Sequence, residues 1–385
     1  MRLSVRCAIA VLAGIGGFAS PAPAQDGTFL IRLGRDTVAF DSYRWSGSTV
    51  EGTLLVRTPA TRLFSYRGEV DAAGAFTRFE VSRRPGAGGA ADLTISYEFT
   101  GDSARTTTVR NGQTETATLA ARNVVPLVSP LYSMGLYERI LRQAPTGAGD
   151  TATVPILTLG SRAAGQTRVW HRGPDTLAVQ FPGGAFLGTL DADGRLTGLQ
   201  GFETTVKIEV SRQPLMDLAP LAAGFAQRDA AGAGLGPTSP RDSLTATAAG
   251  ATIAVNYGRP HKRGRTVYGN LVPAGEVWRT GANAATAFTT DRPLKFGDQT
   301  LPAGAYTLWS LLTTEGGTLI INGQTGQWGT QYDASKDVLR VPLQVRTLPS
   351  PVEEFTITVD SAPDGGSLRL TWDTREFTAA FKIVN

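Results

Sequence analysis

Residues 50–81 read VEGTLLVRTPATRLFSYRGEVDAAGAFTRFEV, and this stretch predicts the architecture of the first half of the chain. Apolar and polar side chains alternate within it over residues 50–56, 63–70 and 76–81, and short turn-forming runs separate the three segments. A period of two residues places alternate side chains on opposite faces of a β-strand. The stretch therefore predicts three antiparallel strands joined by tight connections.

The same pattern continues on both sides of this stretch, at residues 29–33, 93–99 and 206–210. One segment differs, because apolar residues follow Pro130 at helical spacing until Pro145. They are Leu131, Met134, Leu136, Tyr137, Ile140 and Leu141. We therefore expect residues 25–225 to form an antiparallel curved β-sheet with one helix. In architecture alone this resembles periplasmic lipoprotein carriers, whose open sheets hold apolar ligands; the alternative is that the helix itself fills the concave face.

A change in composition divides the chain at residues 226–241, which read AQRDAAGAGLGPTSPR and predict a flexible linker. Beyond it, eight short segments have strand character. They are residues 252–257, 285–290, 306–312, 319–322, 338–345, 355–359, 368–372 and 377–383. Short strands separated by turns predict a second domain, residues 242–385, with a β-sandwich or jelly-roll fold.

The first 24 residues have the pattern of a signal peptide. Arg2 and Arg6 precede an apolar run over residues 7–18, and Ala22 and Ala24 supply the small side chains of a cleavage site. We expect cleavage after Ala24 and a periplasmic or secreted product. Cys7 is the only cysteine, so the processed chain would contain neither a disulfide nor a thiol nucleophile.

Composition excludes several function classes. Lysine and arginine are scattered and the formal net charge is only +4, which argues against nucleic acid as a partner. His171 and His261 are the only histidines and have no nearby metal-ligand spacing, so no metal site is predicted. The chain also lacks a nucleophile elbow, a phosphate-binding loop and a dinucleotide fingerprint, so no cofactor is indicated. The apolar run is too short for a membrane span, and the sequence leaves the oligomeric state open.

Polar motifs gather in the second half. Residues 257–265 read YGRPHKRGR, residues 271–273 read LVP, and residues 278–283 read WRTGAN. Residues 301–308, LPAGAYTL, and residues 337–340, DVLR, follow in order. In these elements and their order, residues 245–383 resemble the bacterial family called domain of unknown function 2911. The resemblance implies no activity and leaves the first half of the chain outside it.

The arginines of these motifs suggest a binding site. Guanidinium groups bind carboxylates, phosphates and sulfates with paired hydrogen bonds. We predict a site for an anionic or carbohydrate molecule, with aromatic side chains as stacking surfaces. Its residues are Tyr257, Arg259, Arg263, Arg265, Trp278, Arg279 and Asn283. The alternative is a structural role, in which Arg279 pairs with Glu276, Glu353 or Glu354.

Three functions follow from these alternatives. The first is a non-enzymatic binding or structural protein of the cell envelope that uses the arginine-rich loop. The second is a hydrolase that uses two converging carboxylates from Glu276, Asp298, Asp333 and Asp337. The third is a carrier that holds an apolar ligand on the first sheet.

Overall fold

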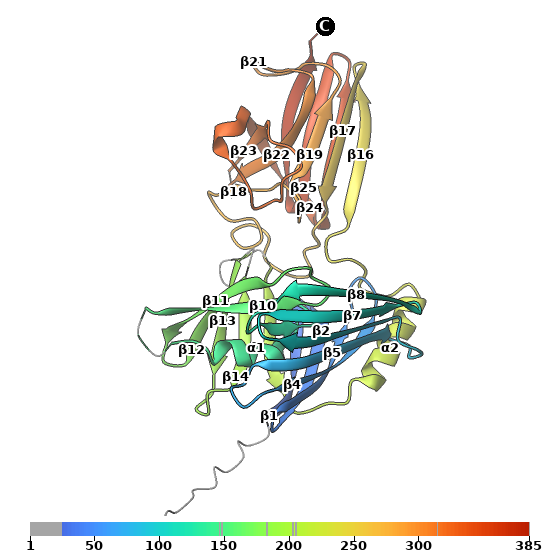
Figure 1. Ribbon diagram of the computed structural model, residues 1–385. Helices are drawn as coiled ribbons and strands as arrows, with labels where there is room; N and C mark the ends of the chain where they lie inside the picture. Colours follow the sequence, from blue (N-terminus) through green and yellow to red (C-terminus); the bar gives the residue numbers. More distant parts are fainter. Residues whose placement is uncertain are drawn as a thin grey trace, which may run out of the picture.

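The computed structural model describes residues 25–145, 147, 149–181, 184–201, 204, 206–313 and 315–384. These residues form two β-sheets, and the C-terminal sheet lies above the N-terminal sheet in the view of Figure 1. The chain is mainly β, which confirms the fold class expected from the alternating pattern. The predicted signal peptide lies outside the described residues.

The N-terminal sheet contains fifteen strands, with β8 and β9 at its edges and β1 between β2 and β15. The strands are β1 (Gln25–Leu33), β2 (Asp36–Ser46), β3 (Thr49–Val56), β4 (Arg62–Val70), β5 (Phe76–Pro85), β6 (Leu93–Thr100), β7 (Ser103–Arg110), β8 (Gln113–Ala120), β9 (Val125–Leu127), β10 (Thr151–Thr158), β11 (Gly165–Gly173), β12 (Thr176–Phe181), β13 (Gly184–Leu190), β14 (Leu196–Gly201) and β15 (Ile208–Gln213). The prediction of a purely antiparallel sheet is wrong at one point, because β9 and β10 run parallel. A helix lies between them in the sequence, and parallel neighbours need such a crossover.

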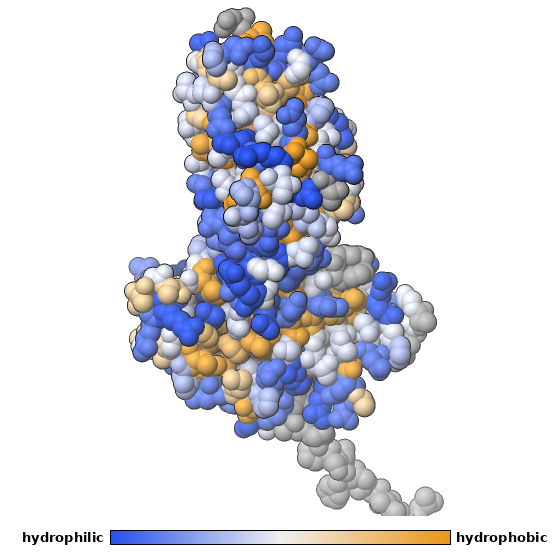
Figure 2. Space-filling model, turned by 180° about the vertical axis from the view of Figure 1, so that it is seen from behind, coloured by the Kyte–Doolittle hydropathy of each residue, from blue (hydrophilic) through white to orange (hydrophobic). Residues whose placement is uncertain are grey.

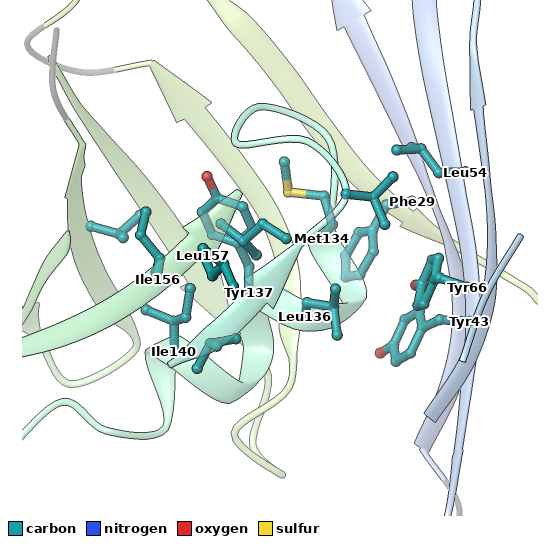
Figure 3. Close-up of a cluster of buried hydrophobic side chains, with 14 of the residues drawn as sticks. Phe29, Tyr43, Leu54, Tyr66, Met134, Leu136, Tyr137, Ile140, Ile156 and Leu157 are labelled. Carbon is teal, nitrogen blue, oxygen red and sulfur yellow. The ribbon is translucent and has the colours of Figure 1, made fainter. Parts of the chain in front are cut away.

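Helix α1 (Met134–Leu141) lies at the predicted place and is almost entirely buried. Its side chains pack against both halves of the sheet (Figure 3). Leu136 lies near Phe29 and Tyr43 on one side, while Ile140 lies near Ile156 of β10 on the other. The sheet therefore curves around its own helix, which occupies the space that a carrier would keep for a ligand.

A second helix, α2 (Ala219–Ala230), was not expected from the sequence. It covers the opposite face of the sheet, where Leu218 and Phe225 pack with Phe40 and Leu55. Its apolar pattern is weak because the helix is rich in alanine and only Ala222 within it is fully buried. No helix in the described part of the chain is long and apolar enough to cross a membrane.

The C-terminal sheet contains ten strands, and its neighbouring strands pair antiparallel. They are β16 (Arg241–Ala248), β17 (Ala251–Gly258), β18 (Val277–Trp278), β19 (Thr286–Thr290), β20 (Leu294–Phe296), β21 (Gln299–Leu301), β22 (Gly304–Leu312), β23 (Gly317–Asn322), β24 (Asp337–Ala362) and β25 (Gly365–Ile383). Two pairs of predicted strands are thus the halves of β24 and β25. The pairing of β24 shifts between Thr347 and Val352, where Pro349 and Pro351 supply no N–H to the ladder.

Strand β24 lets this sheet fold over on itself, because its first part pairs with β23 and its remainder with β25. Aromatic rings meet in the enclosed space. Trp278 of β18 meets Phe355 of β24 edge-on (5.0 Å between ring centroids) and stacks on Trp372 of β25 (5.9 Å). The sheet therefore encloses one core as a β-sandwich does, but its two layers belong to one continuous sheet.

The segment predicted as a flexible linker differs from that expectation. Residues 226–230 complete α2, and Arg241 begins β16. Between them, the Gly236 carbonyl accepts a hydrogen bond from Thr58 Oγ1 (2.9 Å) and the Leu235 carbonyl accepts one from Arg263 (3.2 Å). The segment is bonded to both sheets at the junction, where the rear surface is dominated by hydrophilic side chains (Figure 2).

Candidate functional site

The arginine-rich loop leaves β17 at Gly258 and lies at the junction of the two sheets. Backbone contacts fix its path. Phe355 N donates to the Pro260 carbonyl (3.0 Å), and a Cβ at Gly258 would lie 2.2 Å from the Ala282 carbonyl oxygen. Because the backbone is held so closely, each arginine of the loop has a defined environment, and the environments differ.

Tyr257 lies in the core rather than in a site. Its hydroxyl accepts a hydrogen bond from Ile357 N (3.0 Å), and its ring meets Phe355 edge-on (5.9 Å). Burial raises the pKa of the hydroxyl. The prediction that Tyr257 offers a stacking surface to a ligand is therefore wrong, because its ring is already covered by the protein.

Arg259 is held by carboxylates. Its guanidinium lies 3.2 Å from Asp242 Oδ2 and 3.0 Å from Glu354 Oε2. It also donates to Thr356 Oγ1 (3.1 Å). This arrangement matches the structural alternative, with Arg259 as the partner of Glu354, so Arg259 is corrected from a ligand contact to a structural clasp.

Arg263 connects the two sheets. Its buried guanidinium donates to Asp36 Oδ2 on β2 (2.6 Å) and to the Leu235 carbonyl (3.2 Å). Its backbone carbonyl accepts a hydrogen bond from Arg35 N (2.9 Å). At Gly34, which has a φ of +62°, a Cβ would lie only 2.1 Å from that same carbonyl oxygen. Arg263, which was predicted as a ligand contact, is therefore corrected to a structural clasp between the sheets.

Arg265 differs from these two, because it lines a cavity of about 180 Å³ at the junction. Its Nε donates to the Lys262 carbonyl (3.0 Å) and its terminal nitrogen to the His261 carbonyl (2.5 Å). Burial, with the charge of Arg263 adding to the effect, lowers the pKa of Arg265 to about 10. The side chain is still a cation at neutral pH.

Three further residues of the predicted site line the same cavity: Trp278, Arg279 and Asn283. Burial lowers the pKa of Arg279, whose Nε donates to the Gly281 carbonyl (3.3 Å). Asn283 is exposed and has a φ of +64°, a conformation that asparagine adopts more readily than most residues. Trp278 and Trp372 contribute aromatic edges to the wall while their rings stack in the core.

Other parts of the wall come from residues that the sequence did not mark as a site. They are Leu33, Leu131, Tyr132, Val206 and Ile208 of the N-terminal part, and Thr238 and Ser239 of the connecting segment. Their only local signal was membership of a predicted strand, helix or linker, so the tertiary arrangement alone could identify them. Among the described lining residues two are arginines and none is a carboxylate. The cavity is therefore a positively charged space with both polar and apolar surface.

A second group of buried charges lies under α1. Glu138 accepts hydrogen bonds from Tyr43, from Arg212 and from Leu196 N (2.9 Å). Burial alone would lower the pKa of Arg212, but the charge of Glu138 holds that pKa above its usual value. Arg212 also lies over the ring of Phe29, 4.7 Å from its centroid. This ion pair joins α1 to the sheet.

Asp41 of β2 is the other acid of this group. Its carboxylate accepts hydrogen bonds from the Tyr66 hydroxyl (3.0 Å) and from Gly135 N at the start of α1 (2.8 Å). Burial raises the pKa of Asp41 to about 7, and the hydrogen bonds only partly oppose this shift. No feature of the sequence distinguished Asp41 from the other acids.

The carboxylates considered for a hydrolase do not line the junction cavity. They are Glu276, Asp298, Asp333 and Asp337. Asp337 instead binds Arg340 (2.7 Å) and the Tyr332 hydroxyl (2.7 Å).

Burial is the main cause of a lowered pKa at His261, and the charges of Arg263 and Arg259 add to it. Within the described ranges, no three His, Cys, Asp or Glu side chains are grouped so that they could hold a metal ion.

Comparison with known proteins gives little beyond the C-terminal part. No curated protein matches the sequence. Among solved structures, a DUF1089 family protein from Pseudomonas aeruginosa is 10% identical over 43% of this chain and 90% of that chain, with a TM-score of 0.29. Transferrin binding protein B from Neisseria meningitidis is 9% identical over 91% of this chain and 66% of that chain, with a TM-score of 0.13. The Haemophilus parasuis protein of that name is 8% identical over 94% and 77%, with a TM-score of 0.14.

Scores this low carry no argument about fold or function. The comparison with protein families, by contrast, does give a match. The family described as "Protein of unknown function (DUF2911)" matches residues 239–381. That range contains all the polar motifs of the second half, from the arginine-rich loop to the DVLR element, and leaves out the N-terminal sheet. Residues 239–381 of this chain therefore belong to the DUF2911 family.

Proposed function

We propose that this chain is a non-enzymatic binding protein of the cell envelope, exported by the signal peptide of residues 1–24, that holds a small anionic molecule in the junction cavity. One observation carries the proposal: Arg265 and Arg279 line the same cavity, and no carboxylate is among its described lining residues. A cavity of this charge favours an anion over a neutral or cationic molecule.

The energetics of Arg265 support this choice. Burying a cation costs free energy, which lowers the pKa of Arg265. Two carbonyl groups accept hydrogen bonds from its guanidinium, but a carbonyl carries only a partial charge. An anion in the cavity would supply the full negative charge and offset the cost of burial.

The competing functions find less support. A carrier needs an open apolar groove on the N-terminal sheet, whereas α1 packs there with Leu136 and Ile140 fully buried. A hydrolase needs two carboxylates that face a common space. The candidates of the C-terminal sheet lie away from the cavity, and Asp337 is bound to Arg340.

The proposal is tested by thermal unfolding of the full chain with a panel of small anions and their uncharged analogues at pH 7. A ligand at 100 times its Kd should stabilise the folded protein by about 2.7 kcal/mol. We expect at least one anion to raise the Tm of the wild type and of Arg292→Gln, which removes an exposed arginine outside the cavity. The same anion should leave Arg265→Gln unchanged. If no anion acts, or if all three proteins respond equally, the cavity is not an anion site.

Export is tested separately. The charged start, the short apolar run and the Ala22 to Ala24 site predict a chain that begins at Gln25. Intact mass of the protein extracted from the cell envelope measures this directly. A protein in that fraction that still carries residues 1–24 would refute the export proposal and leave the binding proposal standing.

A further inference from the structure

We infer that the junction cavity takes a small monocarboxylate with a flat apolar body, of about the size of a benzene ring. This inference rests on the proposed anion-binding function and names the class of anion. Three properties of the cavity carry it: its volume, the division of its wall into a charged and an apolar part, and the hydrogen-bonding capacity of Arg265.

Volume limits the ligand first. An apolar cavity of about 150 Å³ is large enough for benzene. The junction cavity measures about 180 Å³, so it offers room for one such ring and a small polar group. The cavity is partly open to solvent, so an oligosaccharide, a nucleotide or a long acyl chain could place only one part inside it and would extend outside.

The wall limits the ligand next. Leu271 and the edges of Trp278 and Trp372 form an apolar surface on one sheet, and Leu33 and Ile208 form another on the other sheet. Inorganic phosphate or sulfate would set some of its oxygens against these apolar surfaces, at a cost in desolvation. A molecule with one charged end and an apolar body avoids that cost, because each end meets a matching wall.

Arg265 determines the charged end. A guanidinium carries five N–H groups. Two of them donate to the His261 and Lys262 carbonyls, and the other three donate to none of the described residues. The terminal nitrogen that makes neither of these bonds is not fully buried, so its two N–H groups are accessible to a ligand. Parallel N–H groups of one guanidinium fit the two oxygens of a carboxylate.

The test uses benzoate as the probe and the tryptophan fluorescence of the full chain as the signal, since Trp278 and Trp372 line the cavity. Acetate offers the same charged group without the ring, benzyl alcohol offers the ring without the charge, and phosphate offers charge alone. We expect benzoate to bind at least ten times more tightly than each of the other three. Affinity should be constant from pH 6 to 8 and should fall below about pH 4, where a carboxylate takes up its proton.

Two variants locate the binding. Arg265→Gln should weaken benzoate binding at least tenfold, and Leu131→Trp, which places a larger side chain in the cavity wall, should do the same. Arg292→Gln should keep the affinity of the wild type. Urea unfolding of each variant checks that it is folded, and Arg265→Gln alone suffices if Leu131→Trp does not fold.

The outcomes separate the two proposals. Binding of phosphate or acetate with no preference for benzoate would overturn the monocarboxylate inference and leave anion binding intact. Equal affinity of benzoate for wild type and Arg265→Gln would place it elsewhere on the protein and overturn the inference. Absence of binding by every anion would overturn both proposals.

Discussion

Two groups of charged side chains, one under α1 and one at the junction of the two sheets, are neutralised by protein atoms to different extents. Under α1, Glu138 meets the guanidinium of Arg212 within a closely packed core. At the junction, Arg263 forms an ion pair with Asp36, whereas its neighbour Arg265 donates hydrogen bonds to backbone carbonyls beside a cavity and feels the charges of Glu353 and Asp36 without pairing with either. A side chain that already pairs with an opposite charge in the fold gains little stabilisation from a charged ligand. A cation beside an unfilled cavity can still be stabilised by an anion that binds there.

The largest effect is expected under α1. Glu138→Gln leaves the guanidinium of Arg212 in the core without its carboxylate, and removing one partner of a buried ion pair costs about 3 to 5 kcal/mol. Urea unfolding at pH 7 measures the loss. Glu209→Gln, an exposed change on the neighbouring strand β15, should stay within about 0.5 kcal/mol of the wild type. A loss below 1 kcal/mol for Glu138→Gln would mean that packing of α1 alone holds it to the sheet.

Asp41 should make the stability of this region depend on pH. Its folded-state pKa is about 7 and its ordinary value is 3.8, so between these values the folded chain keeps a proton that the unfolded chain has lost. The contribution of Asp41 to stability is therefore complete below pH 4 and falls by about 4 kcal/mol as the pH rises to 7. Asp41→Asn has no proton to lose, so its unfolding free energy should lack this fall. Parallel pH profiles of the two proteins from pH 4 to 7 would contradict the burial argument.

At the junction, the clasp should matter less than the ion pair under α1. Arg263→Ala removes a buried guanidinium from Asp36, which is itself partly exposed, and we expect a loss of about 2 to 3 kcal/mol. Arg35→Ala breaks an exposed ion pair with Glu353 across the same junction and should cost less than 1 kcal/mol. Equal losses of unfolding free energy for the two variants would show that the burial of a contact does not determine how much that contact stabilises the junction.

The smallest effect on stability is expected at Arg265. Replacing it with glutamine removes a cation that has no carboxylate partner, so the unfolding free energy without ligand should stay within about 0.5 kcal/mol of the wild type. A loss of more than 2 kcal/mol would place Arg265 with Arg263 as a structural residue and would remove the contrast between the two.

The sequence predicted those strands whose burial alternates, such as β4 and β5, and it predicted α1 from its apolar spacing. It gave no signal for β8, because nearly all of its residues are exposed and its pattern is polar throughout. Strand β2 was missed for the opposite reason, since six consecutive residues of it are buried. Alternation identifies a strand only where one face is buried and the other is not.

The candidate site was only partly predictable. The motif block marked all four arginines, but the same chemical group serves as a clasp at Arg259 and Arg263 and lines a cavity at Arg265 and Arg279. For Arg263 the difference depends on Asp36, which lies in the other sheet and more than 200 residues away in the chain. For Arg259 it depends on Asp242 and Glu354. No local sequence pattern shows which acidic side chain will form an ion pair with which basic one.

The shared wall of the junction cavity has a consequence for solubility. Ile208 and Leu33 belong to one sheet, and Leu271 and Trp278 belong to the other, so each sheet covers apolar surface of its neighbour. A fragment that contained either sheet alone would expose its share of this surface to water, and contiguous exposed apolar surface promotes self-association. We therefore expect that Arg263, by holding the two sheets together, also reduces aggregation of the chain.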